Sequence, residues 1–244
     1  MKNKSPTPII FLVAIACFAL GLFSVWMRSP ATAEATPTPQ TAFDQQQTTL
    51  LLIWVDNLHS ENPQLLGTWF MTYRLPAKDI FLLGLPVGSA DTSQDLSSLR
   101  SRFEYSDSEG LSSNFLAAVQ QKTPLTPDQW IVFDQVAFST FVDYLGGIQF
   151  DGGQLHGDQV IGLVTFLSTD SEALLSTQQR IFIALSKQAP SMGVTPDLTP
   201  LTRLIPEHVS LSAEISHLLT LTIPLLPMAP ETTHIEIYHS VSPE

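Results

Sequence analysis

The sequence predicts an α/β domain, in which a central β-sheet is covered by helices on both faces. Two observations carry this prediction. Segments with strand character alternate with segments of helical periodicity between residues 48 and 240, and such alternation favours a sheet covered on both sides. Residues 48–55 (TTLLLIWV) form a continuous apolar run, which is typical of a strand buried on both faces. A chain of 244 residues is long enough for one such domain with a real core.

The first predicted element is a membrane anchor. Residues 9–27 contain no charged side chain, and an apolar run of this length can cross a bilayer as one helix. Lys2 and Lys4 precede it, so residues 1–8 are expected in the cytoplasm and the C-terminal domain outside. A cleavable signal peptide is the alternative, because residues 31–33 (ATA) have the A-x-A pattern. The uncleaved anchor is favoured because the apolar run is longer than a usual signal core, and it predicts a single-pass protein of the cell membrane.

The segment behind the anchor is predicted to be a linker. Residues 28–47 are rich in Pro, Thr, Ala and Gln and show no apolar period. After Arg28, which directly follows the anchor, the chain carries eight Lys and Arg against all 23 Asp and Glu, about −15 in net charge. A surface of this charge repels nucleic acid. Cys17, the only cysteine, lies in the apolar run, so no disulfide can form within the chain.

The remaining elements follow from periodicity and from turn residues. Residues 141–150 (FVDYLGGIQF) begin within a helix that has one apolar stripe. Asp134 or Gln135 opens this helix, Asp134 being the better cap. The helix ends at Gly146, where a left-handed residue suits a helix end. Ile148 and Phe150 then share one face of a strand. Pro76 and Pro86 end two of the earlier strands. In order, the predicted strands are 48–55, 68–75, 79–85, 130–133 and 233–238; the other predicted helices are 112–122, 158–167, 171–187, a short one near Leu201 and 211–221.

Four segments together indicate more than a fold class: TLLLIWVDN (49–57), GTWFMTYRLPAKDIFLLGLP (67–86), DQWIVFDQVAFSTFVDYLGGIQFDG (128–152) and LHGDQVIGLVTF (155–166). This order resembles the LytR-CpsA-Psr family, in which a helix runs into L-G-G-V-x-V and an L-x-G-x-x-A-L segment follows. Residues 145–148 (LGGI) and 155–159 (LHGDQ) are close matches at the right spacing. The likeness spans residues 48–240, and it implies a central mixed sheet flanked by helices behind one N-terminal transmembrane helix.

The resemblance also implies a chemistry. Members of the family transfer a glycopolymer from a polyprenyl-pyrophosphate carrier to the cell wall. An apolar pocket takes the lipid, several arginines hold the pyrophosphate, and acidic residues hold a magnesium ion. Guanidinium groups suit this task because they clamp phosphate oxygens through bidentate hydrogen bonds while charge develops on them.

This sequence departs from the family at those charged positions. R-S-D-T is replaced by LLGT at 65–68, S-I-P-R-D by GLPVG at 84–88, and R-x-x-R-Q by LLSTQ at 174–178. Thr165 and Leu167 occupy the positions of two further arginines of the family. Among the polar positions of the family's active centre, only Asp56 and Gln178 remain. One carboxylate without a partner makes a poor magnesium site. Loss of one transition-state donor costs ~3 kcal/mol, so the loss of several abolishes transfer.

These departures predict a catalytically degenerate protein of envelope assembly that acts as a lipid-binding or partner module without a cofactor. The alternative is an active phosphotransferase that uses magnesium and a site rebuilt from Arg74 and Arg180. If a polyprenyl-type lipid binds, its tail is expected to hold it, with weak headgroup selectivity. The candidate pocket walls are apolar residues that the resemblance places between the sheet and its helices: Trp69, Met71, Ile161, Val164, Phe166 and Leu218.

Three polar groups allow two interpretations each. Asp56 is either a relic metal ligand or a turn residue after a strand, and the adjacent Asn57 favours the turn. Gln178 and Gln179 are interpreted as surface or capping groups of a helix rather than ligand contacts. His234, Glu236 and Tyr238 alternate along one strand and are interpreted as the solvent face of an edge strand rather than a metal or ligand site.

Overall fold

The computed structural model describes residues 46–75, 77–88, 98–188, 197–214, 216–217 and 233–239. All of them belong to one compact unit that begins at Asp44. The predicted anchor at 9–27 and the linker up to residue 45 lie outside the described residues. Within the described ranges, no helix is both long enough and apolar enough to cross a membrane.

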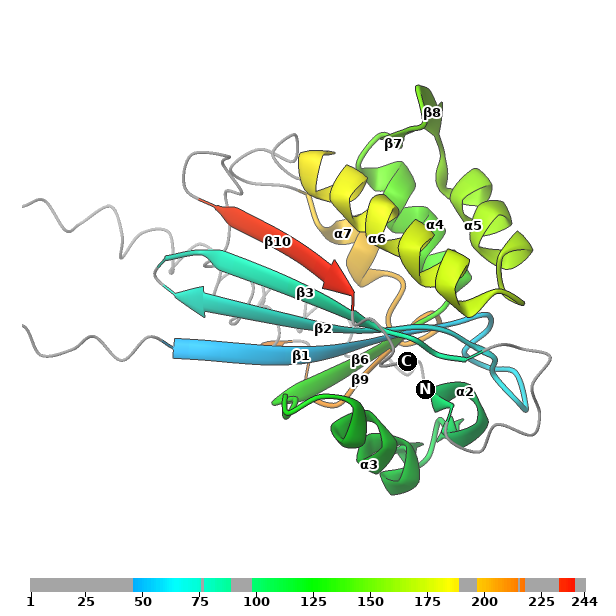
Figure 1. The fold of residues 1–244 in the computed structure, drawn as a ribbon, viewed down its shortest axis with the longest axis vertical. Coiled ribbons are helices and arrows are strands. Elements are labelled where there is room, and N and C mark those ends of the chain that lie inside the picture. The colour runs from blue at the N-terminus through cyan, green and yellow to red at the C-terminus, as the bar shows by residue number, and fades with distance from the viewer. Residues whose placement is uncertain are drawn as a thin grey trace, which may run out of the picture. The chain divides into compact units, whose positions relative to one another are not determined.

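A mixed six-stranded sheet organises the domain, in the order β10-β3-β2-β1-β6-β9 (Figure 1). The first three strands form an antiparallel meander. β6 then adds parallel to β1, β10 adds parallel to β3 at one edge, and β9 adds antiparallel to β6 at the other. The strands are β1 Gln46–Val55, β2 Leu65–Leu75, β3 Asp79–Leu85, β6 Gln129–Phe133, β9 Val209–Leu211 and β10 His234–His239.

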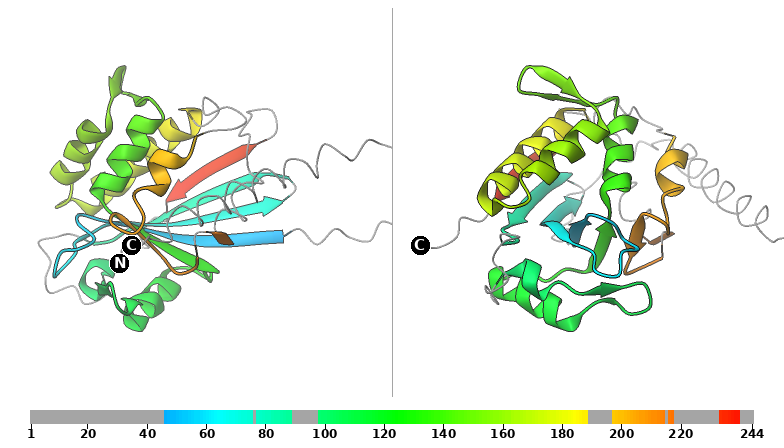
Figure 2. Two further views of the ribbon diagram at one scale, coloured as in Figure 1. Left: turned by 180° about the vertical axis from the view of Figure 1, so that it is seen from behind. Right: turned by 90° about the vertical axis from the view of Figure 1, so that its right-hand side faces the viewer.

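Helices cover both faces of this sheet, as the sequence predicts. The short α2 (Leu99–Arg102) and α3 (Ser113–Lys122) lie on one face. The helices α4 (Gln135–Tyr144), α5 (Gly157–Phe166) and α6 (Ser171–Gln188) lie on the other, with the single turn α7 (Thr199–Thr202) beside them (Figures 1 and 2). Two small hairpins complete the described fold, β4–β5 (Tyr105–Ser106 and Gly110–Leu111) and β7–β8 (Ile148–Phe150 and Gly153–Leu155).

The double glycine forms a helix-to-strand corner. Asp134 caps α4 by accepting the Ala137 N–H at 3.0 Å, and the chain turns at Gly146 and Gly147, whose φ angles are +80° and +88°. L-residues rarely adopt such angles. A Cβ at Gly147 would also lie 2.8 Å from the carbonyl oxygen of Leu155. Glycine is therefore required at this corner for backbone conformation and for space.

The core consists of two clusters of buried side chains. The larger one contains Trp54, whose ring lies 4.1 Å from that of Phe138 between centroids, and it extends to α3 on the opposite face. The smaller cluster is formed by side chains of β1, β2, β3 and α6, namely Leu50, Trp69, Tyr73, Ile80, Leu82 and Leu175. Both faces of β1 are buried, which confirms the interpretation of its continuous apolar run.

The structure corrects some element predictions. β2 begins at Leu65 rather than at residue 68. The predicted helix at 211–221 is wrong at its start, because Leu211 belongs to β9; residues 218–221 lie outside the described residues. The predicted strand that contains Ile148 and Phe150 is confirmed as β7. The strands β4, β5, β8 and β9 went unpredicted because they have only two or three residues, too few to show a period of two.

Candidate functional site at one end of the sheet

The positions that match the family motifs converge at one end of the sheet. β2 runs antiparallel to β1 and β3, so the end of β1 and the end of β3 both lie beside the start of β2: Val55 pairs with Leu65, and Leu85 with Thr68. The connection from α5 to α6 reaches the same place, because the Gly88 N–H donates to the Ser171 hydroxyl at 3.1 Å. We call this region, formed by residues 56, 65–68, 84–88, 100, 168–171 and 174–178, the sheet end.

Gln178 lies buried at the sheet end, with 1% of its surface exposed. Its Nε2 donates to the carbonyl oxygen of Leu66 at 2.8 Å, and its Oε1 accepts from Nε1 of Trp69 at 3.0 Å. The interpretation of Gln178 as a surface or capping group is therefore wrong, because α6 turns this side chain toward β2. Gln179, the next residue on α6, donates from Nε2 to the carbonyl oxygen of Ile237 in β10 at 2.9 Å.

Side chains of the protein itself fill the space beside two strand glycines. A Cβ at Gly67 would lie 2.8 Å from Oε1 of Gln178. A Cβ at Gly84 would lie 2.7 Å both from Cδ1 of Leu175 and from the Trp69 indole. The indole also packs edge-on against Phe182, at 4.7 Å between ring centroids. The amide of α6 and the indole of β2 thus occupy the volume that strand side chains at these two positions would need.

Arg100 is the cation at the sheet end, and sequence reasoning missed it. Its Nε donates to the carbonyl oxygen of Leu65 at 3.1 Å and its Nη1 to that of Ser168 at 2.9 Å. The buried Nη2 group has no hydrogen-bond partner among the described residues, and burial lowers the pKa of the guanidinium. No carboxylate in the described part of the chain forms an ion pair with it. Arg100 therefore ties the start of β2 to the end of α5 rather than presenting an open clamp.

Asp56 is held within the loop that joins β1 to β2. Its Oδ1 accepts the backbone N–H groups of Asn57 and Gln64, both at 2.7 Å, and its own N–H donates to the Gln64 carbonyl oxygen at 3.1 Å. This geometry is that of a turn residue. Within the described residues, no hydrogen bond joins the Asp56 carboxylate to the Gln178 amide, so the two retained family positions serve separate contacts.

The sheet end does not fit a magnesium ion. The described residues hold no cluster of three or more His, Cys, Asp or Glu side chains suited to a metal. Positions 67 and 88, where the family motifs carry Asp, are glycines, and the Asp56 carboxylate already accepts two backbone hydrogen bonds. Magnesium is usually held by one or two carboxylates together with substrate phosphates. Asp170, the second carboxylate of the sheet end, accepts the backbone N–H groups of Glu172 and Ala173 through Oδ1 at 3.2 and 3.0 Å, so it is engaged at the start of α6 rather than completing such a set.

Two His–Asp pairs lie around the loops beside the sheet end. The buried Asp134, directly after β6, accepts a hydrogen bond from Nδ1 of His208 through its Oδ2 at 2.9 Å. The exposed His59 contacts Asp107 in the same way at 3.1 Å. The hydrogen bond to Asp107 raises the pKa of the His59 ring. These pairs join loops that are far apart in sequence, and residue spacing alone gives no sign of them.

Neither arginine proposed for a rebuilt site lies at the sheet end. Arg74 is at the other end of β2, opposite Asp79, with its guanidinium 5.4 Å from the centroid of the Phe81 ring. Arg180 is on α6, but its guanidinium lies over the Phe150 ring at 4.5 Å and pairs with Asp151. Both guanidinium groups therefore stabilise local structure elsewhere.

The candidate lipid-pocket residues do not form one wall. Trp69 is buried and Met71 half-buried on the face of β2 that carries the smaller core cluster. Val164 and Ile161 are on α5, where Val164 belongs to the larger cluster and Ile161 packs against it. Phe166 lies on the surface, 81% exposed. Leu218 lies outside the described residues.

Comparisons with known proteins identify the fold. No family model matches the chain, and no curated protein sequence matches it. A LytR-Csp2A-Psr enzyme from Actinomyces oris has a similar structure, with a TM-score of 0.57 and 15% identity over 88% of each chain. TagT bound to LIIa-WTA has a TM-score of 0.54 and 12% identity, over 86% of this chain and 82% of TagT. TagV from B. subtilis has a TM-score of 0.52 and 12% identity, over 79% of this chain and 84% of TagV.

These similarities concern the backbone, because the identities are low. They confirm the mixed sheet with its flanking helices, and the solved neighbours are LytR-CpsA-Psr proteins, the family that the sequence resembles. The chain therefore has the LytR-CpsA-Psr fold. Its sheet end carries one engaged arginine, Arg100, and two carboxylates, Asp56 and Asp170, that accept backbone N–H groups.

Proposed function

We propose that this protein is a membrane-anchored, extracytoplasmic member of the cell-envelope polymer assembly machinery. It binds a lipid or a partner protein but does not transfer a glycopolymer. It uses the LytR-CpsA-Psr fold as a lipid-binding or partner module. The fold similarity supports the link to envelope polymers, since one solved neighbour is a LytR-Csp2A-Psr enzyme and another is TagT bound to LIIa-WTA. The apolar segment at 9–27 supports the anchor.

The proposal that no transfer occurs rests on the charged motif positions that this chain has lost and on the engagement of the retained Gln178 within the protein. The Gln178 amide lies against Gly67, one of the positions where the family motif has a charged side chain, and both ends of the amide are hydrogen-bonded to β2. A pyrophosphate would have to displace this amide and break two buried hydrogen bonds. Breaking these hydrogen bonds leaves the indole N–H of Trp69 and the carbonyl oxygen of Leu66 unpaired. An unpaired polar group is costly in a buried site.

Electrostatics support the same conclusion. Phosphoryl transfer depends on fixed positive charge around the phosphate oxygens. At the sheet end the described residues offer Arg100, whose Nε and Nη1 are bonded to backbone carbonyls. The whole chain carries a net charge of −12, which disfavours approach of a pyrophosphate.

An apolar ligand has more support than a charged one. On the face of the smaller core cluster, several apolar side chains of β2 and of the edge strand β10 are only partly buried, among them Met71, Leu75, Ile235 and Ile237. Such a surface gains roughly 25 cal/mol per Å² of apolar area that a lipid tail covers, before the cost of association. Tail binding needs no cation, so headgroup selectivity is expected to be weak.

The alternative function is an active phosphotransferase, and the unpaired Nη2 of Arg100 is the observation that favours it. A transfer assay separates the two. The full chain in detergent is incubated with a polyprenyl-pyrophosphate-linked glycan and magnesium, with the Actinomyces oris enzyme as positive control. The proposal predicts no release of polyprenyl pyrophosphate by this protein. Magnesium-dependent release that is lost in Arg100→Met would instead establish the transferase.

A further inference from the structure

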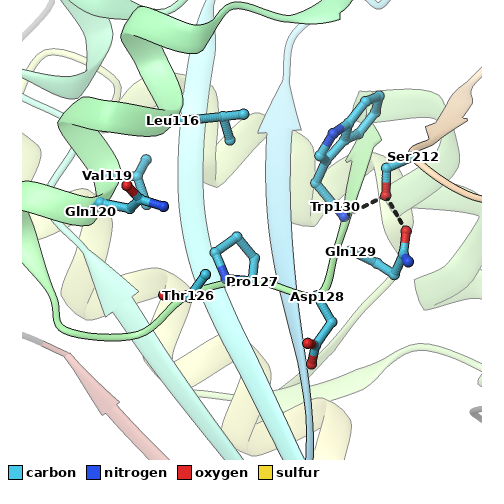
Figure 3. Close-up of a pocket in the computed structure, with 9 residues that line it drawn as sticks. All are labelled: Leu116, Val119, Gln120, Thr126, Pro127, Asp128, Gln129, Trp130 and Ser212. Atoms are coloured by element: carbon cyan, nitrogen blue, oxygen red, sulfur yellow. Dashed lines mark hydrogen bonds between the residues drawn. The ribbon is translucent and has the colours of Figure 1, made fainter.

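A cavity of about 340 Å³ lies on the other face of the sheet from α6, between α3 and the start of β6 (Figure 3). Its volume is at the small end of the range for ligand pockets, about 300–1,000 Å³. It is separate from the sheet end, because Gln129 at its edge pairs with Leu50, well before β1 ends. Its lining residues are Leu116, Val119, Gln120, Thr126, Pro127, Asp128, Gln129, Trp130 and Ser212.

One side of the cavity is apolar and contains a positioned aromatic ring. Leu116 and Val119 from α3 lie across from Trp130, and Pro127 lies between them (Figure 3). The indole is held at its edge by the β4–β5 hairpin, since a Cβ at Gly110 would lie 2.9 Å from its Cζ2. A half-buried indole fixed in this way offers an apolar ring face to a ligand.

The other side of the cavity is polar and partly preorganised. Oδ2 of Asp128 accepts the Thr49 N–H at 2.8 Å. The Ser212 hydroxyl accepts the backbone N–H of Trp130 at 2.8 Å and donates to Oε1 of Gln129 at 2.7 Å (Figure 3). These contacts fix three side chains, those of Asp128, Gln129 and Ser212. No other described residue bonds Oδ1 of Asp128 or the amide N–H groups of Gln129, which are therefore available to a ligand. The rim thus combines hydrogen-bond donors with acceptors, which suits hydroxyl groups because each hydroxyl both donates and accepts.

The charge of the lining restricts the ligand. One carboxylate and no Lys or Arg lines the cavity, so phosphates and carboxylates lack the cation that normally binds them. We propose that this cavity binds a neutral, hydroxyl-rich ring, such as one saccharide unit, with its apolar face against Trp130 and its hydroxyls toward Asp128, Gln129 and Gln120. The proposal does not depend on the function of the sheet end.

Fluorine NMR of the full chain tests this site. The protein is labelled with 5-fluorotryptophan in a detergent that has no sugar headgroup, and Trp130→Phe identifies the Trp130 signal. Trp54 and Trp69 are each 1% exposed and serve as internal references. Cellobiose and di-N-acetylchitobiose should shift the Trp130 signal saturably, whereas glucose 6-phosphate and choline should not at equal concentration.

Two variants of α3 make the test specific. Gln120→Ala removes an exposed amide that lines the cavity, while Gln121→Ala removes an exposed amide that does not. Both substitutions favour the helical conformation of α3, because alanine has the highest helix propensity. Loss of one hydrogen bond should raise the saccharide dissociation constant about threefold to tenfold in Gln120→Ala and leave it unchanged in Gln121→Ala. The proposal is overturned if no saccharide shifts the signal, if choline or glucose 6-phosphate binds more tightly, or if the two variants behave alike.

Discussion

Replacement of Gln178 by leucine removes the amide that occupies the sheet end while keeping a side chain of similar length. The substitution leaves the indole N–H of Trp69 and the backbone carbonyl of Leu66 without their hydrogen-bond partner, and both residues are buried. An unpaired buried donor or acceptor costs about 1–3 kcal/mol. The two groups together therefore predict a loss of about 2–5 kcal/mol in the free energy of unfolding, once some gain from burying leucine is allowed.

Equilibrium denaturation in guanidinium, followed by far-ultraviolet circular dichroism, measures this change. In thermal unfolding, each kcal/mol of lost stability lowers the Tm of a domain of this size by about 2–4 °C, so a decrease in Tm near 10 °C is expected. Ser176→Ala is the matched control, because this exposed residue lies on the same helix and should change stability by less than about 0.5 kcal/mol. A Gln178→Leu protein as stable as the control would refute the conclusion that the amide is a structural part of the sheet end.

Gln178→Glu adds a test with a pH signature. Burial raises the pKa of a carboxyl group, and the protonated acid can make both hydrogen bonds that the amide makes. A raised folded-state pKa means that the stabilisation is present below the unfolded-state pKa of about 4.3 and is lost as pH rises through the folded-state value. The variant should therefore approach wild-type stability near pH 4 and fall below it at pH 7, each compared with wild type at the same pH.

Three further predictions concern the surrounding contacts. Gly67→Ala should lower the free energy of unfolding by about 1–3 kcal/mol in urea denaturation, because its Cβ would lie 2.8 Å from Oε1 of Gln178; wild-type stability would contradict the packing. Asp56→Ala should cost about 1–2 kcal/mol with or without magnesium, since it removes two backbone hydrogen bonds; a magnesium-dependent difference would indicate a metal ligand. An NMR titration should find the His59 pKa raised by its hydrogen bond to Asp107 and lowered again in Asp107→Ala. The pair should stabilise the folded protein below the unfolded-state pKa of about 6.5, and this stabilisation should be lost as pH rises through the folded-state pKa.

Features set by neighbouring residues were predictable from the sequence. The Asp134 cap, the glycine corner at 146–147 and the alternation of β10 all depend on a few residues within one segment, and the structure has each of them. Ile235 and Ile237 pack against the smaller core cluster while Glu236 is exposed, as the edge-strand interpretation expects. The resemblance also pointed to the positions that converge at the sheet end, although their replacement residues differ from those of the family.

Contacts across the fold could not be predicted in this way. Gln178 is separated from Trp69 and Leu66 by 109 and 112 residues, and a glutamine on a helix shows no sign in sequence of a buried partner. Arg100 lies in a four-residue helix, too short for a periodic pattern, and its carbonyl partners carry no side-chain signature. Phe166 continues the apolar run of α5 in sequence, yet it lies where the helix ends and faces solvent.

The central claim is that the sheet end has no place for a pyrophosphate headgroup. Native mass spectrometry of the full chain after mild extraction tests this claim most directly. The protein is offered polyprenyl phosphates, polyprenyl pyrophosphates and neutral polyprenols of equal length, with and without magnesium. The contacts of Gln178, Trp69 and Arg100 predict that any lipid bound is retained without preference among these headgroups. A clear preference for the phosphorylated lipids that disappears in Arg100→Met would contradict the claim and show that a cationic site has been retained.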